Sequence, residues 1–198
     1  MTRSDAVELG TRVAASKYLG IVATGFATFI AHEAVFDHVS GLNLELNRTR
    51  RLGAELDLHS DPTSWLALEA DVTIVDARFV DSGNPIPFAP WLAGGFRAMV
   101  THPSGFRAGL RFFGLAPRPL PHGAKGAAMA MLDATLGYYW EHFHLDLAVE
   151  NVLNRHIRAG EYHYASDWDP SDGASQIPVL QTIAGPPLNA RLGVTVVY

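Results

Sequence analysis

The sequence predicts an all-β fold, an antiparallel transmembrane β-barrel of about nine up-and-down strands in one domain. Three observations predict this fold. Apolar and polar residues alternate along much of the chain, which gives a strand one apolar face and one polar face. The connections between the expected strands alternate between short and long. The chain ends in an alternating segment, 188–198, whose last residue is the aromatic Tyr198.

Composition limits the class of protein. The share of charged residues, 18%, is below that of a typical soluble domain. A net charge of −5 argues against a nucleic-acid-binding surface. The chain has no cysteine, so it has neither a disulfide framework nor a Cys-type zinc site. No apolar run is long enough for a transmembrane helix. We therefore expect strands and no nucleic-acid partner.

The expected strands follow one another at 4–15, 18–30, 48–59, 64–80, 91–102, 106–116, 128–141, 144–153 and 188–198. Alternation is clearest in the third, fourth, sixth and eighth of these segments. In the fourth, Leu68, Val72 and Ile74 fall on one face, and Glu69 and Asp71 fall on the other. Helical spacing fits these windows less well, so the pattern predicts strands.

The connections between these strands are sorted by length. Short turns are expected at 16–17, 60–63, 103–105 and 142–143, and long loops at 31–47, 81–90, 117–127 and 154–187. A membrane barrel has short periplasmic turns at one end and long extracellular loops at the other. Aromatic residues are expected near both ends, as at the two membrane interfaces. The alternation of short and long connections places Tyr198 at the periplasmic end and the 154–187 loop outside the cell.

An odd number of strands has a geometric consequence. In a sheet of nine antiparallel strands, the first and the last run in the same direction and cannot pair antiparallel with each other. Bacterial single-chain barrels have even strand numbers. Either this strand count is off by one, or the chain is part of a larger barrel.

Several segments resemble the C-terminal β-barrel portion of TonB-dependent outer-membrane receptors. They are the Arg-rich start of a strand at 47–56, the turn and strand at 62–68, the loop segments at 76–79 and 83–90, the strand end at 147–154, and the segments at 164–166 and 184–187. They occur in the family's order. The terminal strand with Tyr198 resembles the last strand of bacterial outer-membrane barrels, which the assembly machinery reads.

This resemblance implies a domain assignment. Residues 1–198 would form the C-terminal part of a barrel of about 22 strands, without the N-terminal plug domain. Contact with TonB would then occur only through the missing plug. The barrel itself would contact outer-membrane lipid and the barrel-assembly machinery.

Charged residues on the polar strand faces are expected to line the aqueous interior. They are Glu55, Asp57, Glu69, Asp71, Arg97, Arg107, Arg111, Asp133 and Arg191. Opposite charges on neighbouring strands can pair across the sheet. There is no Gly-rich phosphate loop and no Gly-x-Ser-x-Gly motif, so we expect no enzyme activity and no resident cofactor or metal.

Histidines and one carboxylate are the candidates for contact with a substrate at the extracellular loops. They are His32, His38, His122, His156, Glu161 and His163. Imidazoles together with a carboxylate can bind a transition metal, and His156, Glu161 and His163 are the preferred set. A plain structural role in polar loops is the alternative.

Two functions remain open at this stage. The resemblance implies a segment of an outer-membrane receptor for TonB-dependent uptake of a scarce nutrient, such as a siderophore or another metal chelate. The alternative is a self-contained small β-barrel that binds an apolar ligand in the manner of lipocalins. The two hypotheses place the apolar strand faces on opposite sides, against lipid or inside a dry core.

Overall fold

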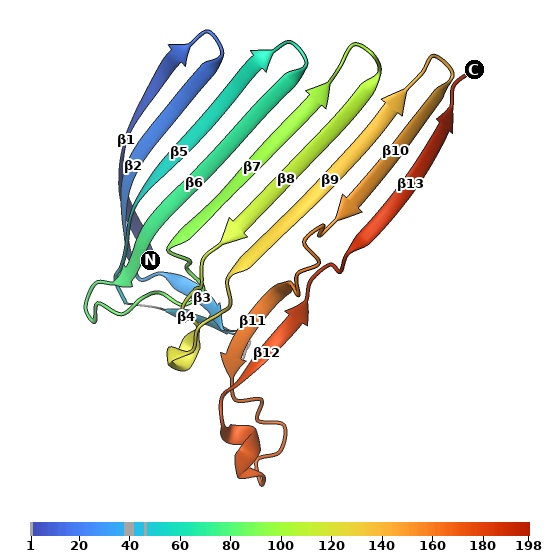
Figure 1. The fold of residues 1–198 in the computed structure, drawn as a ribbon. Coiled ribbons are helices and arrows are strands. Elements are labelled where there is room, and N and C mark those ends of the chain that lie inside the picture. The colour runs from blue at the N-terminus through green and yellow to red at the C-terminus, as the bar shows by residue number, and fades with distance from the viewer. Residues whose placement is uncertain (1, 38–41, 46) are drawn as a thin grey trace.

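A curved sheet of nine antiparallel strands dominates the computed structural model, which describes residues 2–37, 42–45 and 47–198 (Figure 1). The strands are β1 (Arg3–Ser16), β2 (Leu19–Ala31), β5 (Thr49–Thr63), β6 (Leu66–Phe79), β7 (Leu92–Thr101), β8 (Phe106–Leu115), β9 (Met129–Tyr139), β10 (Phe143–Glu150) and β13 (Asn189–Val196). They pair in this order, so the sheet is an up-and-down meander. The predicted all-β, antiparallel fold is confirmed.

Each predicted strand is present, but some boundaries differ. Residues 60–63, predicted as a turn, belong to β5, where a register shift between Ser60 and Thr63 accommodates Pro62 in the strand. Phe143, predicted in a turn, pairs with Val196 and begins β10. That strand ends three residues earlier than predicted, at Glu150, because Asn151 has a left-handed backbone with φ of 53°.

Two further hairpins lie within the long connections, where the sequence predicted only loops. One consists of β3 (Ala34–Asp37) and β4 (Leu42–Glu45), and the other of β11 (Arg158–Tyr164) and β12 (Val179–Ala184). Two short 3₁₀ helices, η1 (Pro121–Gly123) and η2 (Gly173–Gln176), complete the elements. Within the described part of the chain, no helix has the length and apolar character needed to span a membrane.

The two ends of the sheet differ, as the connection lengths predicted. Figure 1 shows the tight turns of β1–β2, β5–β6, β7–β8 and β9–β10 at one end, together with the C-terminus. We call this the short-turn end. The hairpins β3–β4 and β11–β12 and helix η1 lie at the opposite end, which we call the long-connection end.

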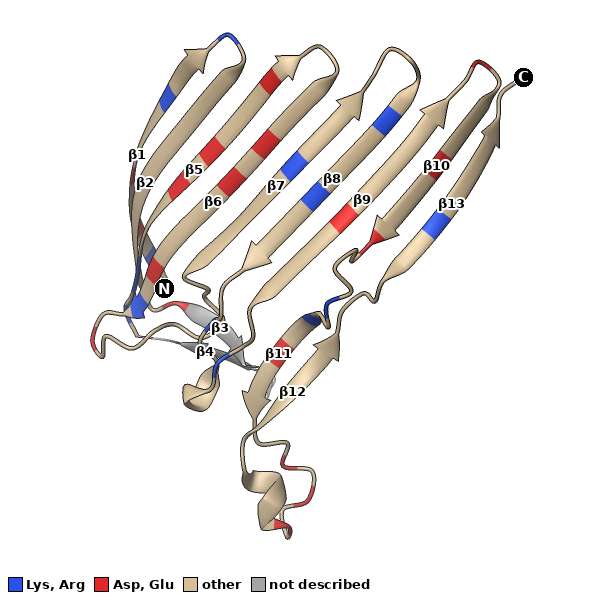
Figure 2. Cartoon of the chain, in the orientation of Figure 1, with Lys and Arg blue, Asp and Glu red and all other residues tan. Residues whose placement is uncertain are grey.

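Register places the charged residues of the sheet on one face. Glu69 lies opposite Arg97, and Arg97 lies opposite Arg111, which in turn lies opposite Asp133. Because side chains alternate along a strand, the same register puts all of the predicted interior residues on this side. We call it the charged face, and it includes Glu55, Asp57, Glu69, Asp71, Arg97, Arg107, Arg111, Asp133 and Arg191. In Figure 2 these charges form bands across the central strands.

The opposite side, the apolar face, is not covered by other parts of the described chain. Leu192 is 71% exposed, Ile74 is 51% exposed and Leu136 is 49% exposed. Among the described residues, Ile86 and Leu120 are the buried apolar side chains, and both lie in long connections. The sheet therefore encloses no dry interior, and the lipocalin-like alternative is wrong.

Both edges of the sheet are open in the described structure. β1 pairs only with β2, and β13 pairs only with β10. Since nine strands alternate in direction, β1 and β13 point the same way. The nine-stranded sheet is thus a curved wall rather than a closed ring.

Candidate functional site

Ion pairs between neighbouring strands connect the charged face. Arg111 Nη2 lies 2.6 Å from Asp133 Oδ2, and Arg97 Nη1 lies 3.4 Å from Glu69 Oε2. The guanidinium of Arg107 lies over the ring of Tyr139, 5.6 Å from its centre. Most of these groups are exposed, so each pair stabilises the sheet only modestly. Their main effect is to keep one side of the sheet polar.

The charged face also carries acidic groups that lack cations. Asp57 lies directly opposite Asp71 in the pairing of β5 with β6. Neither carboxylate, nor that of Glu55, forms an ion pair with any described residue. A hollow of about 450 Å³ opens here, and Arg12, Asp57, His59, Glu69, Asp71 and Arg97 contribute to its lining. This part of the face is polar, acidic and open.

At the long-connection end, a buried carboxylate joins two connections. Glu161 on β11 is only 2% exposed. Its oxygens lie 3.1 Å from Arg118 Nη2 and 3.0 Å from Arg158 Nη1, and they accept the backbone N–H of Ala127. Arg118 and Ala127 belong to the segment between β8 and β9. The cluster therefore fastens that segment to the β11–β12 hairpin.

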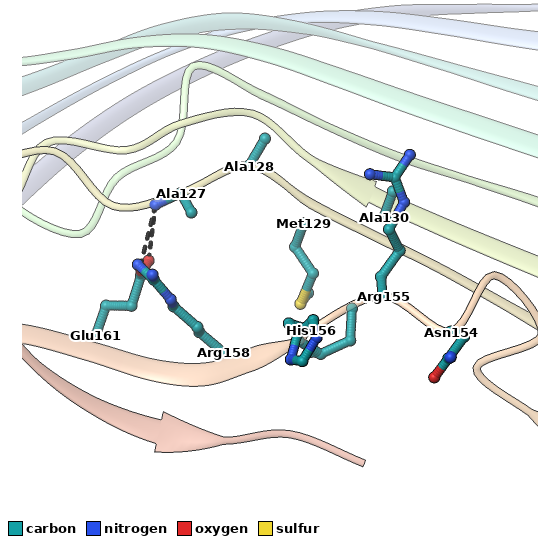
Figure 3. A pocket seen from close by; sticks show the side chains of 10 residues that line it. Ala127, Ala128, Met129, Ala130, Asn154, Arg155, His156, Arg158 and Glu161 are labelled. Carbon is teal, nitrogen blue, oxygen red and sulfur yellow. Dashed lines mark hydrogen bonds and ion pairs between the residues drawn. The ribbon is translucent and has the colours of Figure 1, made fainter. Parts of the chain in front are cut away.

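A cavity of about 490 Å³ lies beside this cluster (Figure 3). Its lining combines small and cationic side chains: Ala127, Ala128, Met129, Ala130, Asn154, Arg155, His156, Ile157, Arg158 and Glu161. Figure 3 shows Glu161 joined to the backbone of Ala127 at one end, with His156 beside Met129. Since Glu161 is already paired, the groups left to meet a ligand there are mainly basic.

Two histidines meet where η1 touches β11. The ring centres of His122 and His163 lie 5.9 Å apart. The Nδ1 of His163 lies 3.0 Å from the carbonyl oxygen of Pro121. His122 also lines a second cavity, of about 660 Å³, whose walls include Phe79, Trp91 and Lys125.

A third polar cluster lies where β2 ends and β5 begins. Glu33 accepts hydrogen bonds from the Thr49 hydroxyl at 2.6 Å and from Arg51 Nη2 at 2.7 Å. Burial alone would raise the pKa of Glu33, but the hydrogen bonds and the charge of Arg51 outweigh it, so the pKa lies below its usual value. Glu33 is therefore ionised at neutral pH.

The structure brings together some of the predicted loop residues and separates others. His122 and His163 are neighbours, His156 lines the 490 Å³ cavity, and His32 directly follows β2. His38 lies outside the described residues. The set of His156, Glu161 and His163 stays a prediction, and in this structure Glu161 forms ion pairs with Arg118 and Arg158. No group of three or more His, Cys, Asp or Glu in the described ranges is arranged to hold a metal ion.

Asn151, Arg118 and Arg158 are not among the site residues predicted from the sequence. Asn151 is fully buried, and its side chain bonds to the backbone N–H and C=O of Arg155 and to the C=O of Pro186. It thus joins both ends of the segment that carries β11 and β12. A partial signal was present, since Asn adopts a left-handed backbone more often than most residues other than glycine. The partnership of Arg118 with Glu161 has no such local signal.

Comparison with known proteins identifies the fold. No family model and no curated protein matches the chain. The ferric-catecholate import receptor Fiu from E. coli K12 matches with a TM-score of 0.73 and 17% identity, over 98% of this chain and 27% of that one. The ferric yersiniabactin uptake receptor FyuA from Yersinia pestis matches with a TM-score of 0.74 and 18% identity, over 100% and 30%.

The copper transporter OprC gives a TM-score of 0.70 and 15% identity, over 100% of this chain and 31% of that one. The chain thus spans about a third or less of the solved structures that it matches. Identities this low show a shared fold. The chain therefore has the fold of part of the β-barrel of TonB-dependent receptors, the family that its sequence motifs resemble.

Proposed function

We propose that the chain forms part of the wall of a TonB-dependent receptor barrel in the bacterial outer membrane. The observation that carries this proposal is the division of an open, single-layered sheet into an apolar face and a charged face. In water, the exposed leucines and valines of the apolar face would be unfavourable over so large a contiguous area. Lipid tails are the medium that such a face suits.

The charged face would line the aqueous interior of the barrel. The interiors of such barrels are polar, and their residues alternate with the lipid-facing ones along every strand. The residues that we assign to the interior are Glu55, Asp57, Glu69, Asp71, Arg97, Arg107, Arg111, Asp133 and Arg191. Their acidic members without cations suit a position beside a further domain or water in that interior.

The long-connection end would face the outside of the cell and meet the cargo first. Matching structures are named as receptors for ferric catecholates and ferric yersiniabactin and as a copper transporter. By analogy, the cargo would be a scarce metal chelate. Coupling to TonB would run through a plug domain. Tyr198, at the short-turn end, would serve as the signal for the barrel-assembly machinery.

Adjacent positions on one strand test the orientation of the two faces. The chain has no cysteine, so the variants Asp71→Cys and Val72→Cys each carry one thiol for a fluorescent label. In the 198-residue chain refolded in detergent micelles, we expect quenchers attached to the acyl chains to act on the label at position 72. A water-soluble quencher should act on the label at position 71.

The reverse pattern would mean that the apolar face is turned inward and would contradict the proposal. So would recovery of a monomer without detergent in which both labels remain in water. Ile74→Cys and Thr73→Cys give an independent pair on the same strand and should repeat the result.

A further inference from the structure

We infer that His122 and His163 form a binding site for a divalent transition-metal ion at the long-connection end, with open positions for further ligands. The inference goes beyond the receptor role and does not depend on it. It replaces the set predicted from the sequence, in which His163 was grouped with His156 and Glu161.

The separation of the two rings suits a shared ion. Their centres lie 5.9 Å apart with the planes inclined by 58°. With metal–nitrogen bonds of about 2 Å, two imidazoles on one ion have ring centres roughly 4.5 to 6.3 Å apart, for angles at the metal from about 90° to 180°. The observed separation falls inside this range, so the distance between the rings is compatible with ligation of one ion.

A hydrogen bond fixes which nitrogen of His163 is available. Its Nδ1 lies 3.0 Å from the carbonyl oxygen of Pro121, and a carbonyl can only accept. Nδ1 therefore carries the proton, and in the neutral ring the lone pair is on Nε2. Metal-ligating histidines usually donate their second ring nitrogen to a carbonyl or carboxylate in this way, which orients the ring and raises its basicity.

The backbone of His122 is in the left-handed region. Its φ is 56° and its ψ is 31°, within the left-handed region, which is uncommon for residues other than glycine although Asn, Asp and His adopt it more often than most. Such conformations occur often at binding sites, where the surrounding structure maintains them. Here the hydrogen bond from His163 to Pro121 ties the same turn to β11. The turn therefore presents an exposed imidazole next to a half-buried one.

The surroundings leave room for further ligands. His122 lies on the wall of the 660 Å³ cavity, together with Asn84, Trp91 and Lys125. Two protein ligands leave the remaining coordination positions of the ion to water or to donor atoms of an incoming chelate. Imidazole favours Cu²⁺, Ni²⁺ and Zn²⁺ over Mg²⁺ and Ca²⁺, so we assign the site to the former group.

Copper(II) is the best probe, because it binds nitrogen sites most tightly among these ions. The full 198-residue chain, purified without a polyhistidine tag, is titrated with Cu²⁺ in detergent. We expect one site tighter than the rest. Its electron paramagnetic resonance spectrum should show coupling to two imidazole nitrogens, and Mg²⁺ should not displace the copper.

Asparagine variants separate ligation from folding. In His163→Asn, the side-chain amide can still donate to Pro121, and in His122→Asn the new residue tolerates the left-handed backbone. We expect each to weaken the tight site by more than about tenfold, since the loss of even an outer-shell partner costs 10- to 100-fold. His156→Asn and His142→Asn are the matched controls and should leave that site unchanged.

Each of the following results would overturn the inference. The wild-type chain could bind copper no more tightly than the His122→Asn/His163→Asn double variant. The tight site could survive both single substitutions. The tight site could instead be abolished by His156→Asn or His142→Asn. Circular dichroism of each variant shows whether the strands are intact. A His122→Asn variant with unchanged strands and unchanged copper binding also contradicts the inference.

Discussion

Asp57 on β5 lies directly opposite Asp71 on β6, so two carboxylates face each other on the charged face. Like charges in directly opposed positions destabilise a sheet. No cation among the described residues pairs with either group. The sheet tolerates the pair because both carboxylates lie in an open hollow.

Removing one of these charges should stabilise the chain. We expect Asp57→Asn and Asp71→Asn each to raise the free energy of unfolding in detergent by roughly 0.2–1 kcal/mol, the range for cross-strand pairs. The double variant should gain little beyond either single one, and high salt should reduce the effect. Glu55→Gln, whose partner on β6 is Thr73, is the control and should change stability less. Strict additivity of the two substitutions would contradict this prediction.

Loss of the Glu161 carboxylate should loosen the long-connection end. Glu161→Gln leaves the largely buried Arg118 without its counter-charge, and breaking a buried pair in this way costs about 3–5 kcal/mol. The expected result is faster hydrogen exchange at the amide of Ala127, which donates a hydrogen bond to Glu161 in the wild type. Glu150→Gln removes the exposed partner of Arg191 and should leave that amide unchanged. Equal exchange in Glu161→Gln and wild type would show that the cluster does not fasten the segment.

Asn151 should be sensitive to both side chain and backbone. Asn151→Ala removes the bonds to Arg155 and Pro186 and places alanine at a φ of 53°, so we expect a loss of about 3 kcal/mol or more. Asn151→Gly is compatible with the positive φ but does not restore the hydrogen bonds, so it should recover only part of the stability lost in Asn151→Ala. Asn154→Gly changes an exposed asparagine with a similar φ of 47° and should be neutral or stabilising. Chemical denaturation in detergent measures all three, and an Asn151→Gly variant as stable as wild type would refute the bonding role.

Acid should release the cluster of Glu33, Thr49 and Arg51. The pKa of Glu33 lies below its usual value of 4.5, so its folded form binds a proton less readily than its unfolded form. The stability that it contributes is therefore complete above pH 4.5 and is lost as the pH falls below that value. Glu33→Gln should be less stable than wild type at pH 7, and the difference should shrink on acidification. A difference that is constant between pH 7 and pH 3 would contradict the assignment.

The sequence predicts the sheet well because each strand carries its own pattern. In 66–74, Leu68 and Val72 alternate with Glu69 and Asp71, and the structure pairs these residues as a strand with one apolar face. The division into two faces needs no knowledge of partners, since it follows from the period of the strand alone. The predicted interior residues consequently share one side of the sheet.

The long-connection end was harder to predict because its contacts are not local. β11 begins within a segment that has no clear alternation, and its Glu161 is held by Arg118 and Ala127, more than 30 residues earlier. Glu161 therefore had the features of a possible ligand in the sequence but has two arginine partners in the structure. For the same reason, the sequence did not predict that His122 would lie beside His163.

The exposed apolar face has a consequence for how such chains diverge. A side chain in a closely packed core must match the shapes of its neighbours, whereas a side chain that meets a fluid medium need only be apolar. Leu192 and Val194 satisfy that demand no better than isoleucine or phenylalanine would. Substitutions can thus accumulate over half of every strand while the backbone ladder persists. If the apolar face meets lipid as proposed, this freedom would allow one architecture to persist at 17% or 18% identity.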